Sequence, residues 1–432
     1  MSPLARALDD FRAAARAFSR PARLYLLSEF LAWTGHGIMS VLYNLYLVEG
    51  GYQESFVGTA VSVVALGLAL TALPAGVLAE RWGRRRCLVL GAVLDGAGFV
   101  VRASVLAPAP ILAASFVAGA GQAMLAIAAA PFITEHSTAR ERTHLFSAFF
   151  ASALLAGVAG SALGGWLPRV AMALPHAARP DLLHAYRAVL LLGAAFCWSA
   201  ALPLLRLRGL VETPLQRADE PVPPDAARRL FPIALNAALI GSGAGLVIPF
   251  MNLYFKSRFR CSSGQIGLFF SLAQVLTALA ALLGPAVARR FGKMRTAVVS
   301  ELLSLPFLVT LGAESHLGIA VVAFWLRATL MQASTPLLQT FIMEALPSGL
   351  RARATSVMNL LWNVGWAVSA TLAGLIIQRF GYAVPFYFTA ALYATAASTF
   401  YLAFRRTPEI PAAPRLSEET KGQRGEGPLL TE

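Results

Sequence analysis

The chain has 432 residues, of which 57% are hydrophobic and 13% are charged. About 25% of the residues in an ordinary soluble domain are charged, and a soluble chain of this length could not bury so much apolar surface. The composition therefore excludes a soluble globular protein and predicts an all-α membrane protein. The formal net charge of +14 does not indicate nucleic-acid binding, because the basic residues are spread over loops rather than gathered on one folded face.

Apolar stretches of about 20 residues, the length that crosses a hydrocarbon core of roughly 30 Å, predict twelve membrane-spanning helices. Six precede a polar break, at 24–48, 56–79, 87–107, 109–134, 144–168 and 187–206. Six follow it, at 230–255, 264–288, 296–313, 316–340, 353–379 and 383–404. Glycine and proline are frequent inside these spans, which is typical of membrane bundles whose helices approach closely.

Lysine and arginine side chains set the predicted orientation. Most of the 36 lie before the first span, in alternate loops and in the tail, all on one side of the membrane. Since cytoplasmic loops carry the positive excess, both termini are predicted to be cytoplasmic in a multi-pass protein of the cell inner membrane. Residues 1–23 lack the apolar region of a signal peptide and instead show the apolar and basic stripes of an amphipathic interfacial helix.

These features divide the chain into five predicted parts. They are an amphipathic cytoplasmic segment at 1–23, an N-terminal six-helix bundle at 24–206, a proline-rich cytoplasmic linker at 207–229, a C-terminal six-helix bundle at 230–404 and a disordered cytoplasmic tail at 405–432.

An internal repeat relates the two bundles. A shift of about 208 or 209 residues places Asn44-Leu45-Tyr46 on Asn252-Leu253-Tyr254. The same shift pairs Gly58 with Gly267, Gly165 with Gly374, and Arg81-Trp82-Gly83-Arg84 with Arg290-Phe291-Gly292-Lys293. Because each half has six spans, both halves enter the membrane from the same side. The repeats are therefore predicted to be parallel, about an axis along the membrane normal.

A specific motif follows the second span, where the sequence reads Gly76-Val77-Leu78-Ala79-Glu80-Arg81-Trp82-Gly83-Arg84-Arg85-Arg86. It resembles the signature G-x-x-x-[DE]-R-x-G-R-[RK] of the major facilitator superfamily, at the loop where that family carries it. The second half keeps Arg290, Gly292 and Lys293 but has Arg289 at the acidic position and Pro285 at the first glycine. The resemblance covers about residues 24–404. It implies a secondary transporter with two pseudo-symmetric six-helix bundles.

Two further patterns point to different branches of that superfamily. Glu135 and Arg142, like Glu344 and Arg351, have the E-x₆-R spacing of its sugar porters. The run Gly160-Ser161-Ala162-Leu163-Gly164-Gly165 is similar to the antiporter motif G-P-x-x-G-G, with serine in place of proline. Because the two patterns disagree, neither identifies the substrate.

Charged residues at the predicted cytoplasmic ends are candidates for a latch between the halves. Glu80 can accept from helix N-terminal amides, where a negative charge is favoured by roughly 0.3–1 kcal/mol, and Arg81 and Arg142 can pair with glutamates. The alternative is that these residues are positive-inside anchors, which we prefer for Arg85 and Arg86. The predicted latch comprises Gly76, Glu80, Arg81, Gly83, Arg84, Glu135, Arg142, Arg290, Gly292, Glu344 and Arg351.

Polar side chains within spans are costly in hydrocarbon and therefore tend to face a cavity or a partner. In the superfamily the first, fourth, seventh and tenth spans line the central cavity, which implies that the polar stripe of the first span faces solute. On this stripe, Glu29 and His36 are the candidates for a protonatable pair, unless Glu29 simply binds an interfacial arginine. The predicted cavity residues are Trp33, Ser40, Tyr43, Asn44, Gln122, Asn252, Arg327, Gln332, Asn359, Asn363 and Trp366.

Three charges lie deep in other spans. Arg327, near the middle of the tenth span, needs a counter-charge, which would be a protein carboxylate or an anionic group of the solute. Asp95 and Arg102 share a face of the third span. Because third spans lie outside the cavity in the superfamily, these two residues are predicted to be structural.

No nucleophile–base motif or phosphate-binding loop is present, and Cys87, Cys197 and Cys261 lack metal-ligand spacing. The sequence thus predicts no enzymatic activity, cofactor or metal. It predicts a monomeric secondary transporter in the lipid bilayer that moves a small organic solute by alternating access. Proton-coupled export of an amphipathic or uncharged compound is preferred over sugar-type uptake. A membrane receptor or scaffold built on a transporter fold is the alternative from another class.

Overall fold

The computed structural model of the chain describes residues 18–173, 181–207 and 225–407. Every secondary-structure element in these ranges is a helix. The predictions made for the amphipathic segment up to residue 17, for the linker at 208–224 and for the tail beyond residue 407 lie outside the described residues.

The described helices fall into two sets that follow the predicted halves. The first set is α2 (Arg20–Glu49), α3 (Glu54–Trp82), α4 (Arg84–Ser104), α5 (Pro108–Glu135), α6 (Ala139–Ala173), α7 (Leu182–Ser199) and the short α8 (Ala201–Leu205). The second set is α9 (Ala226–Val247), the 3₁₀ turn η1 (Ile248–Phe250), α10 (Met251–Phe259), α11 (Ser263–Phe291), α12 (Lys293–Ala313), α13 (Leu317–Ala345), α14 (Ser348–Phe380) and α15 (Ala383–Phe404).

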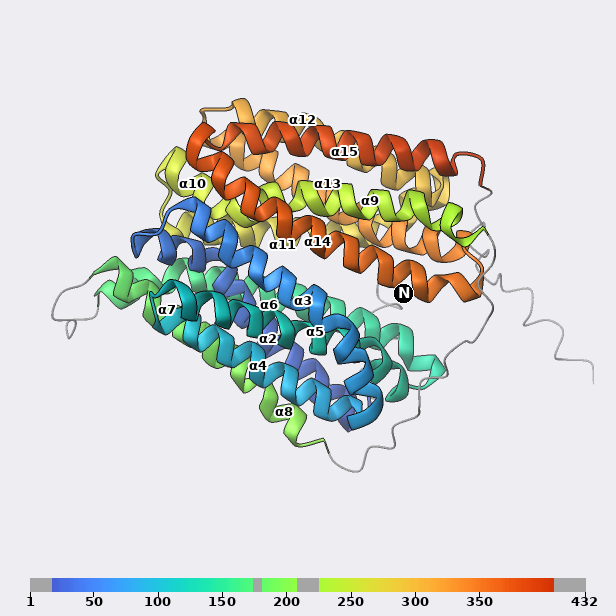
Figure 1. Cartoon of the computed structure of the whole chain (residues 1–432), viewed down its shortest axis with the longest axis horizontal. Helices are drawn as coiled ribbons and strands as arrows, with labels where there is room; N and C mark the ends of the chain where they lie inside the picture. The colour runs from blue at the N-terminus through green and yellow to red at the C-terminus, as the bar shows by residue number, and fades with distance from the viewer. Residues whose placement is uncertain (1–17, 174–180, 208–224, 408–432) are drawn as a thin grey trace, which may run out of the picture.

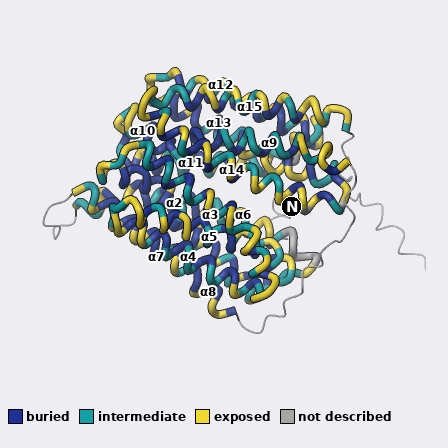
Figure 2. Tube along the Cα trace, in the orientation of Figure 1, coloured by how far each residue is buried: buried dark blue, intermediate teal, exposed yellow. Residues whose placement is uncertain are grey.

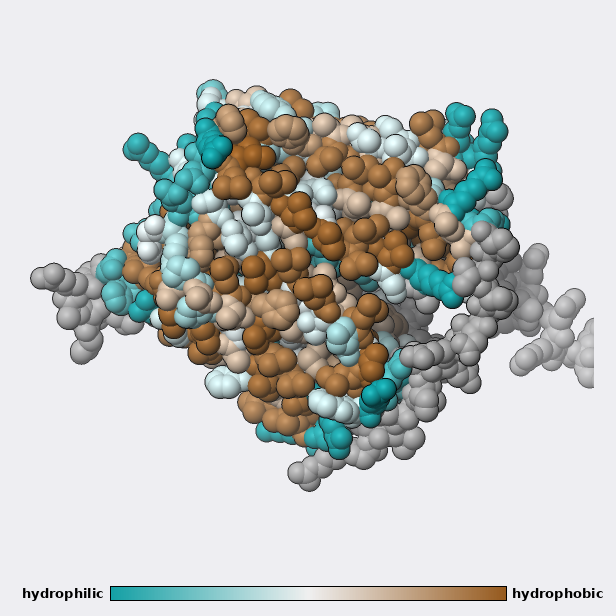
Figure 3. Space-filling view, in the orientation of Figure 1, coloured by the Kyte–Doolittle hydropathy of each residue, from teal (hydrophilic) through white to brown (hydrophobic). Residues whose placement is uncertain are grey.

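These helices have the dimensions of membrane spans. Ten segments are long and apolar enough to cross a bilayer when α7 is joined to α8 and α9 to η1 and α10. Two further helices, α2 with 30 residues and α15 with 22, are also long. Together with the ten segments they make twelve long helical segments in the described ranges. Hydrophobic side chains form a broad band across the bundle, and hydrophilic side chains gather toward its two ends (Figure 3). The fold is thus an all-α membrane bundle.

The two halves lie side by side, and two helix pairs make the most extensive contacts between them (Figure 1). Within the first half, α2 packs on α6 and α7, and α4 packs on α5 and α7. Within the second half, α9 packs on α14 and α15, and α12 packs on α13 and α15. Between the halves, α3 packs on α14 and α6 packs on α11. Under the repeat these two pairs are equivalent, as parallel repeats require.

Four glycines of the repeat form the crossing points between the halves. At each one, an added Cβ atom would overlap a backbone carbonyl of the facing helix. The four pairs are Gly58 with Ala370, Gly267 with Ser161, Gly165 with Ser263, and Gly374 with Glu54. A shift of 209 positions relates the Gly58–Ala370 pair to the Gly267–Ser161 pair. The same shift relates the Gly165–Ser263 pair to the Gly374–Glu54 pair. Glycine is needed here because only a residue without a side chain lets two helices approach this closely.

The halves meet at one end of the bundle, which we call the closed end, and diverge at the other (Figure 1). The closed end contains the connection at 50–53 and the turn at 260–262. There Gln378 donates to Gln53 at 2.5 Å and Arg169 donates to Ser262 at 2.6 Å, so side chains join the two halves. Buried residues are concentrated where the halves meet near α2, α10 and α11 (Figure 2).

The opposite end, which we call the basic end, contains the turns at Gly83 and Gly292, and there the molecule is hollowed between its halves (Figure 3). Gly83 has φ 90° and Gly292 has φ 89°, a region in which side chains are disfavoured. Each glycine stands between two long helices and reverses the chain within a single residue. This backbone requirement explains why both copies of the motif keep the glycine.

Candidate functional site

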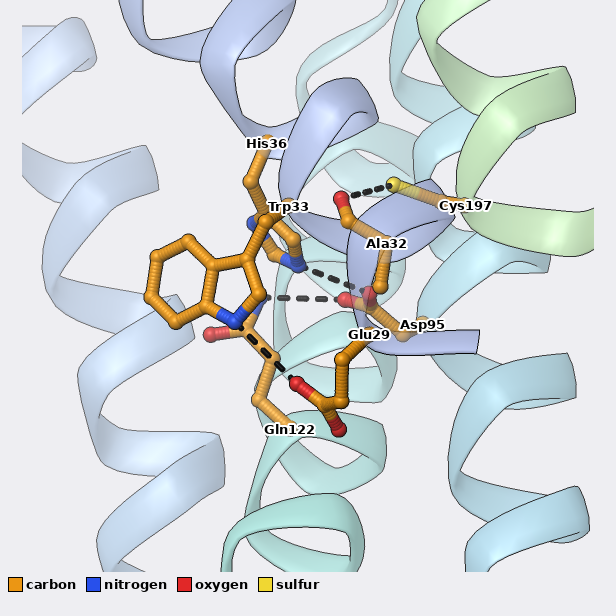
Figure 4. Close-up of polar contacts among 7 residues, drawn as sticks. All are labelled: Glu29, Ala32, Trp33, His36, Asp95, Gln122 and Cys197. Atoms are coloured by element: carbon orange, nitrogen blue, oxygen red, sulfur yellow. Dashed lines mark hydrogen bonds and ion pairs between the residues drawn. The ribbon is translucent and has the colours of Figure 1, made fainter. Parts of the chain in front are cut away.

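A polar cluster lies in the first half, where α2, α4 and α5 converge (Figure 4). His36 Nε2 is 3.0 Å from Asp95 Oδ2, and Gln122 Nε2 donates to Asp95 Oδ1 at 3.0 Å. The Asp95 side chain is 2% exposed, whereas that of His36 is 27% exposed. The carboxylate is therefore held inside the half by two partners, and His36 connects it to the accessible surface.

The second carboxylate of the region, Glu29, has a different partner. Its Oε2 accepts a hydrogen bond from Trp33 Nε1 at 3.1 Å (Figure 4). The structure gives His36 a contact to Asp95 rather than to Glu29, so the role of Glu29 and His36 as a protonatable pair stays a prediction. Residues seven apart on a helix are separated by about 10 Å along its axis, which is beyond hydrogen-bonding reach. Trp33 remains 45% exposed, with its ring 5.8 Å from that of His36.

Asp95 is the functional candidate that the sequence interpretation missed by assigning it a structural role. Glycines allow its helix to pack closely: an added Cβ at Gly91 would meet the Gly121 carbonyl of α5, and one at Gly96 would meet Trp198 of α7. This close packing brings the Asp95 side chain to α2. The signal that could have identified it is general, because an ionisable residue inside a membrane span is a functional candidate by default.

Cys197 of α7 also approaches the cluster. Its Sγ and the nearest donor atoms of His36 and Asp95 all lie within 4.8 Å of one another, and these are atom types that bind zinc-like ions. A metal would need the thiolate form of Cys197. Here the thiol donates to the Ala32 carbonyl at 3.5 Å (Figure 4), and both Asp95 oxygens already accept hydrogen bonds. The geometry therefore favours a hydrogen-bonded network.

Three of the predicted cavity residues are buried near the closed end. Tyr43 is 3% exposed, and the Arg102 guanidinium lies 4.1 Å from its ring centroid. Asn44 and Asn252 are 7% and 1% exposed, and they bond to each other across the halves at 3.3 Å. Their placement differs from the expected solute cavity, because the backbone of the opposite half satisfies their amide groups.

Arg327 is also buried rather than open to the space between the halves. It is 4% exposed and donates to the Tyr393 hydroxyl at 3.4 Å. Tyr393 belongs to α15, which packs on α9 and α12, so this contact lies inside the second half. Tyr393 is the described hydrogen-bond partner of Arg327 in this conformation.

The remaining predicted cavity residues are more accessible. Exposed side chains are Trp33, Ser40, Gln332 and Asn359, whereas Gln122 and Trp366 are intermediate. Asn363 is 9% exposed and donates to the Asn359 carbonyl one turn earlier at 2.8 Å. The Trp366 ring lies 4.9 Å from that of Trp362. Among these residues, only Trp33 and Gln122 have a described contact to the His36–Asp95 cluster.

The basic end contains two equivalent ion pairs. Arg84, at the start of α4, pairs with Glu135 at the end of α5. Lys293, at the start of α12, pairs with Glu344 in α13 at 2.5 and 2.6 Å. The predicted latch, in which Arg81 or Arg142 pairs with a glutamate, stays a prediction. The two observed pairs each lie within a half. The turn glycines explain this, because they place the first residue of the next helix beside the glutamate.

The other predicted latch residues are spread along the same end. Glu80, Arg81 and Arg290 are exposed, and Arg290 lies over the ring of Phe291. Arg351 Nε donates to the Leu346 carbonyl at 3.1 Å. An added Cβ at Gly76 would meet no atom within 4 Å, so this motif glycine is not required by packing. The side chain of Arg142 lies outside the described residues.

The Arg84–Glu135 pair is nearly buried, with side chains 7% and 13% exposed. Replacing Arg84 with glutamine should therefore destabilise the protein by about 3–5 kcal/mol, because the nearly buried Glu135 carboxylate loses this ionic partner. The equivalent Lys293→Gln, whose pair is 18% and 30% exposed, should cost about 1 kcal/mol or less. Denaturant unfolding in detergent measures both. Equal losses of stability for the two single variants would contradict the role of burial. The double variant Arg84→Gln/Glu135→Gln should be more stable than Arg84→Gln alone.

Known transporters share this architecture over nearly the whole chain. A bacterial homologue of the human lysosomal transporter Spinster, in an inward-facing conformation, superposes with a TM-score of 0.72 at 16% sequence identity, covering 89% of this chain and 96% of that one. A D-xylose–proton symporter gives a TM-score of 0.72 at 15% identity, covering 88% and 97%. At these identities the likeness establishes the fold alone.

Sequence relatives match over shorter regions. The cis,cis-muconate transport protein of Acinetobacter baylyi is 29% identical over 153 residues, which is 35% of this chain and 37% of that protein. An MFS-type transporter of Aspergillus cristatus is 29% identical over 142 residues, 32% of this chain and 30% of that protein. The matched region is thus about a third of each relative. A family model matches far more, residues 25–232 and 233–430. The chain belongs to the Major Facilitator Superfamily.

Proposed function

We propose that this protein is a secondary active transporter that couples proton movement to the export of a small organic solute by alternating access. The observation that carries the proposal is the His36–Asp95 pair, in which a buried carboxylate contacts a partly exposed imidazole. Histidine is the side chain whose ordinary titration lies nearest physiological pH. The pair therefore has the composition of a site that gains and loses a proton from the space between the halves.

The physical basis of coupling is the cost of an unbalanced charge in a medium of low dielectric constant. With a proton on the pair, Asp95 is balanced by His36 and held by Gln122. Without the proton, a carboxylate that is almost fully buried keeps only neutral hydrogen-bond donors in this cluster. A conformation that admits water to Asp95 is then favoured. Proton binding therefore shifts the conformational equilibrium. The size of the shift is set by the difference in the site's proton affinity between the two conformations.

The accessible part of the site suggests the kind of solute. Trp33 presents an exposed indole beside His36, and its N–H is held by Glu29. An aromatic face beside a few polar groups suits an amphipathic or uncharged organic molecule. The sequence relatives named above include a transport protein for cis,cis-muconate. Sugar-type uptake is the second candidate, since Glu135 and Glu344 of the E-x₆-R spacing lie beside the helix starts Arg84 and Lys293 at the basic end.

In this proposal the basic end faces the cytoplasm of the cell inner membrane, since positively charged loops are retained on that side. The hollow between the halves is then the cytoplasmic entrance, and the closed end faces outward. A solute would enter between α2 and the second half. Export would follow when the closed end opens and the basic end closes.

The test begins with a thermal-shift screen of the purified protein against sugars, lipids, amino acids, organic acids and drugs. A stabilising compound is then supplied as a gradient to proteoliposomes that contain a pH-sensitive dye. We expect solute movement to drive a proton flux that empty vesicles do not show. Solute flux without a pH change would refute proton coupling. Failure of every stabilising compound to cross faster than in empty vesicles would refute transport.

A further inference from the structure

Two equivalent asparagines connect the halves at the centre of the closed end. Asn44 of α2 donates to the Pro249 carbonyl at 2.5 Å and to Asn252 Oδ1 at 3.3 Å. Asn252 of α10 donates back to the carbonyls of Val41, at 3.0 Å, and of Ser40, at 3.2 Å. We propose that Asn44 and Asn252 are the gate residues of the closed end, whose mutual bonds must break before the protein opens on that side. The inference rests on the proposed alternating access.

The bonds of this pair obey the internal repeat. A shift of 208 positions carries Asn44 to Asn252 and Val41 to Pro249. The bond from Asn44 to Pro249 is therefore the equivalent of the bond from Asn252 to Val41. The pseudo-two-fold axis passes between the two amides, so the contact lies where the halves must separate. A residue that merely fills the core of one half would show no such reciprocity.

A break in the helix makes the acceptor available. The 3₁₀ turn Ile248–Phe250 separates α9 from α10 and contains Pro249. After the turn, the Leu253 N–H donates to Asn252 Oδ1 at 2.9 Å, and the Pro249 carbonyl accepts from Asn44. Interrupted helices that expose backbone carbonyls are found in transporters where the helix lines a cavity or an interface. Asn252 thus binds both the backbone of its own neighbour Leu253 and the backbone of α2.

Two serines extend the contact on either side of the axis. Ser62 donates to the Ala367 carbonyl at 2.5 Å, and Ser271 donates to the Val158 carbonyl at 3.1 Å. These bonds are also equivalent under the repeat, since both residues of the first bond lie 209 positions from those of the second. They lie beside the crossing glycines. The buried part of the contact at the closed end is therefore made by neutral side chains that bind backbone carbonyls of the opposite half.

Opening is possible because these groups are neutral. A buried charge without its partner is strongly unfavourable, whereas an amide or hydroxyl that exchanges a protein acceptor for water loses little. When the closed end opens, water can reach each asparagine and each carbonyl. The gate is thus strong enough to favour closure and weak enough to be overcome by solute and proton binding.

The experiment measures the closed end directly. Spin labels are placed on exposed residues of each half, at Ala109→Cys and Ser315→Cys, in a protein whose three described cysteines are buried. Pulsed electron paramagnetic resonance on proteoliposomes should give mainly the short distance for the parent protein. Asn44→Ala and Asn252→Ala should each raise the ratio of long to short distances by about tenfold. The double variant should fall below the product of the two, because they share one bond.

The control is Thr59→Ala on α3, whose hydroxyl returns to the Ser55 carbonyl of its own helix at 3.0 Å. It should leave the distances unchanged. Should the asparagine variants fail to fold, Ser62→Ala and Ser271→Ala provide a milder opening of the same contact. An unchanged distance distribution in all folded variants would overturn the gate. If the distances respond but solute moves no protons, coupling fails and the gate stands. If the distances stay unchanged but solute movement carries protons, the gate is overturned and proton coupling stands.

Discussion

Replacing Asp95 with asparagine should abolish solute accumulation driven by a pH gradient while leaving solute exchange intact. The variant keeps an acceptor for Gln122 and a similar shape, but it removes the ionisable group that His36 contacts at 3.0 Å. Without the Asp95 carboxylate, the proton affinity of this site should no longer differ between the two conformations. A pH gradient then cannot shift the conformational equilibrium. The measurement is uptake of radiolabelled solute into proteoliposomes, with and without an imposed gradient, beside exchange at equal pH on both sides.

Glu29→Gln is the matched control for that experiment, since Glu29 is also a buried carboxylate of the same half, 9% exposed. Its partner is Trp33 rather than His36. We expect it to change solute affinity and to retain gradient-driven accumulation. The opposite pattern, with Glu29→Gln uncoupled and Asp95→Asn fully coupled, would return the proton to Glu29. Loss of exchange in Asp95→Asn would show that Asp95 has a structural role instead.

Adding a single methyl group at Gly267 should prevent the halves from closing. An alanine Cβ there would lie 2.5 Å from the Ser161 carbonyl oxygen and 2.7 Å from Gly165 Cα. Both neighbours are backbone of α6 and have little freedom to move. Overpacking of this kind costs about 1–3 kcal/mol or more. We expect Gly267→Ala to lower the melting temperature and to reduce transport to the level of empty vesicles.

Gly76→Ala is the control at the other end of an equivalent helix, because an added Cβ there meets no atom within 4 Å. Alanine in place of an interior helix glycine stabilises by about 0.5–1 kcal/mol. The melting temperature should therefore rise slightly, although Gly76 belongs to the family motif. If Gly267→Ala transports at the parent rate, the crossing has more room than the structure indicates. A loss of stability in Gly76→Ala would reveal a contact made in another conformation.

Most of the fold could be predicted from the sequence because the bilayer sets the length of each apolar run. The ninth span, expected at 296–313, is the helix Lys293–Ala313. Helix starts were less accurate, since polar turns outside the hydrocarbon carry no hydropathy signal, and α6 begins at Ala139 rather than 144. The repeat correctly paired Gly58 with Gly267. It could not reveal that each contacts the opposite half, because equivalence in sequence says nothing of which faces meet.

The site was harder to predict for a different reason. The cost of a polar group in hydrocarbon identified Asn44 and Asn252 as residues that need a partner, but it could not distinguish water in a cavity from carbonyls of the other half. For Asp95, the decisive fact is how closely α4 approaches α2. That distance depends on glycine contacts among α4, α5 and α7. Hydropathy and spacing describe one helix at a time, whereas these partners arise between helices.

The reciprocal bonds of Asn44 and Asn252 make the contact between the halves isologous, as in a two-fold homodimer, although a single chain forms it. Fusion into one chain frees each half to change independently. At the positions equivalent to His36 and Asp95, the second half has Ala244 and Ser304, neither of which binds a proton at physiological pH. The contact between the halves is thus symmetric, whereas the His36–Asp95 pair occurs only in the first half. Under the proposed coupling, this pair would therefore carry one proton per cycle, whereas a homodimer of the first half would carry two.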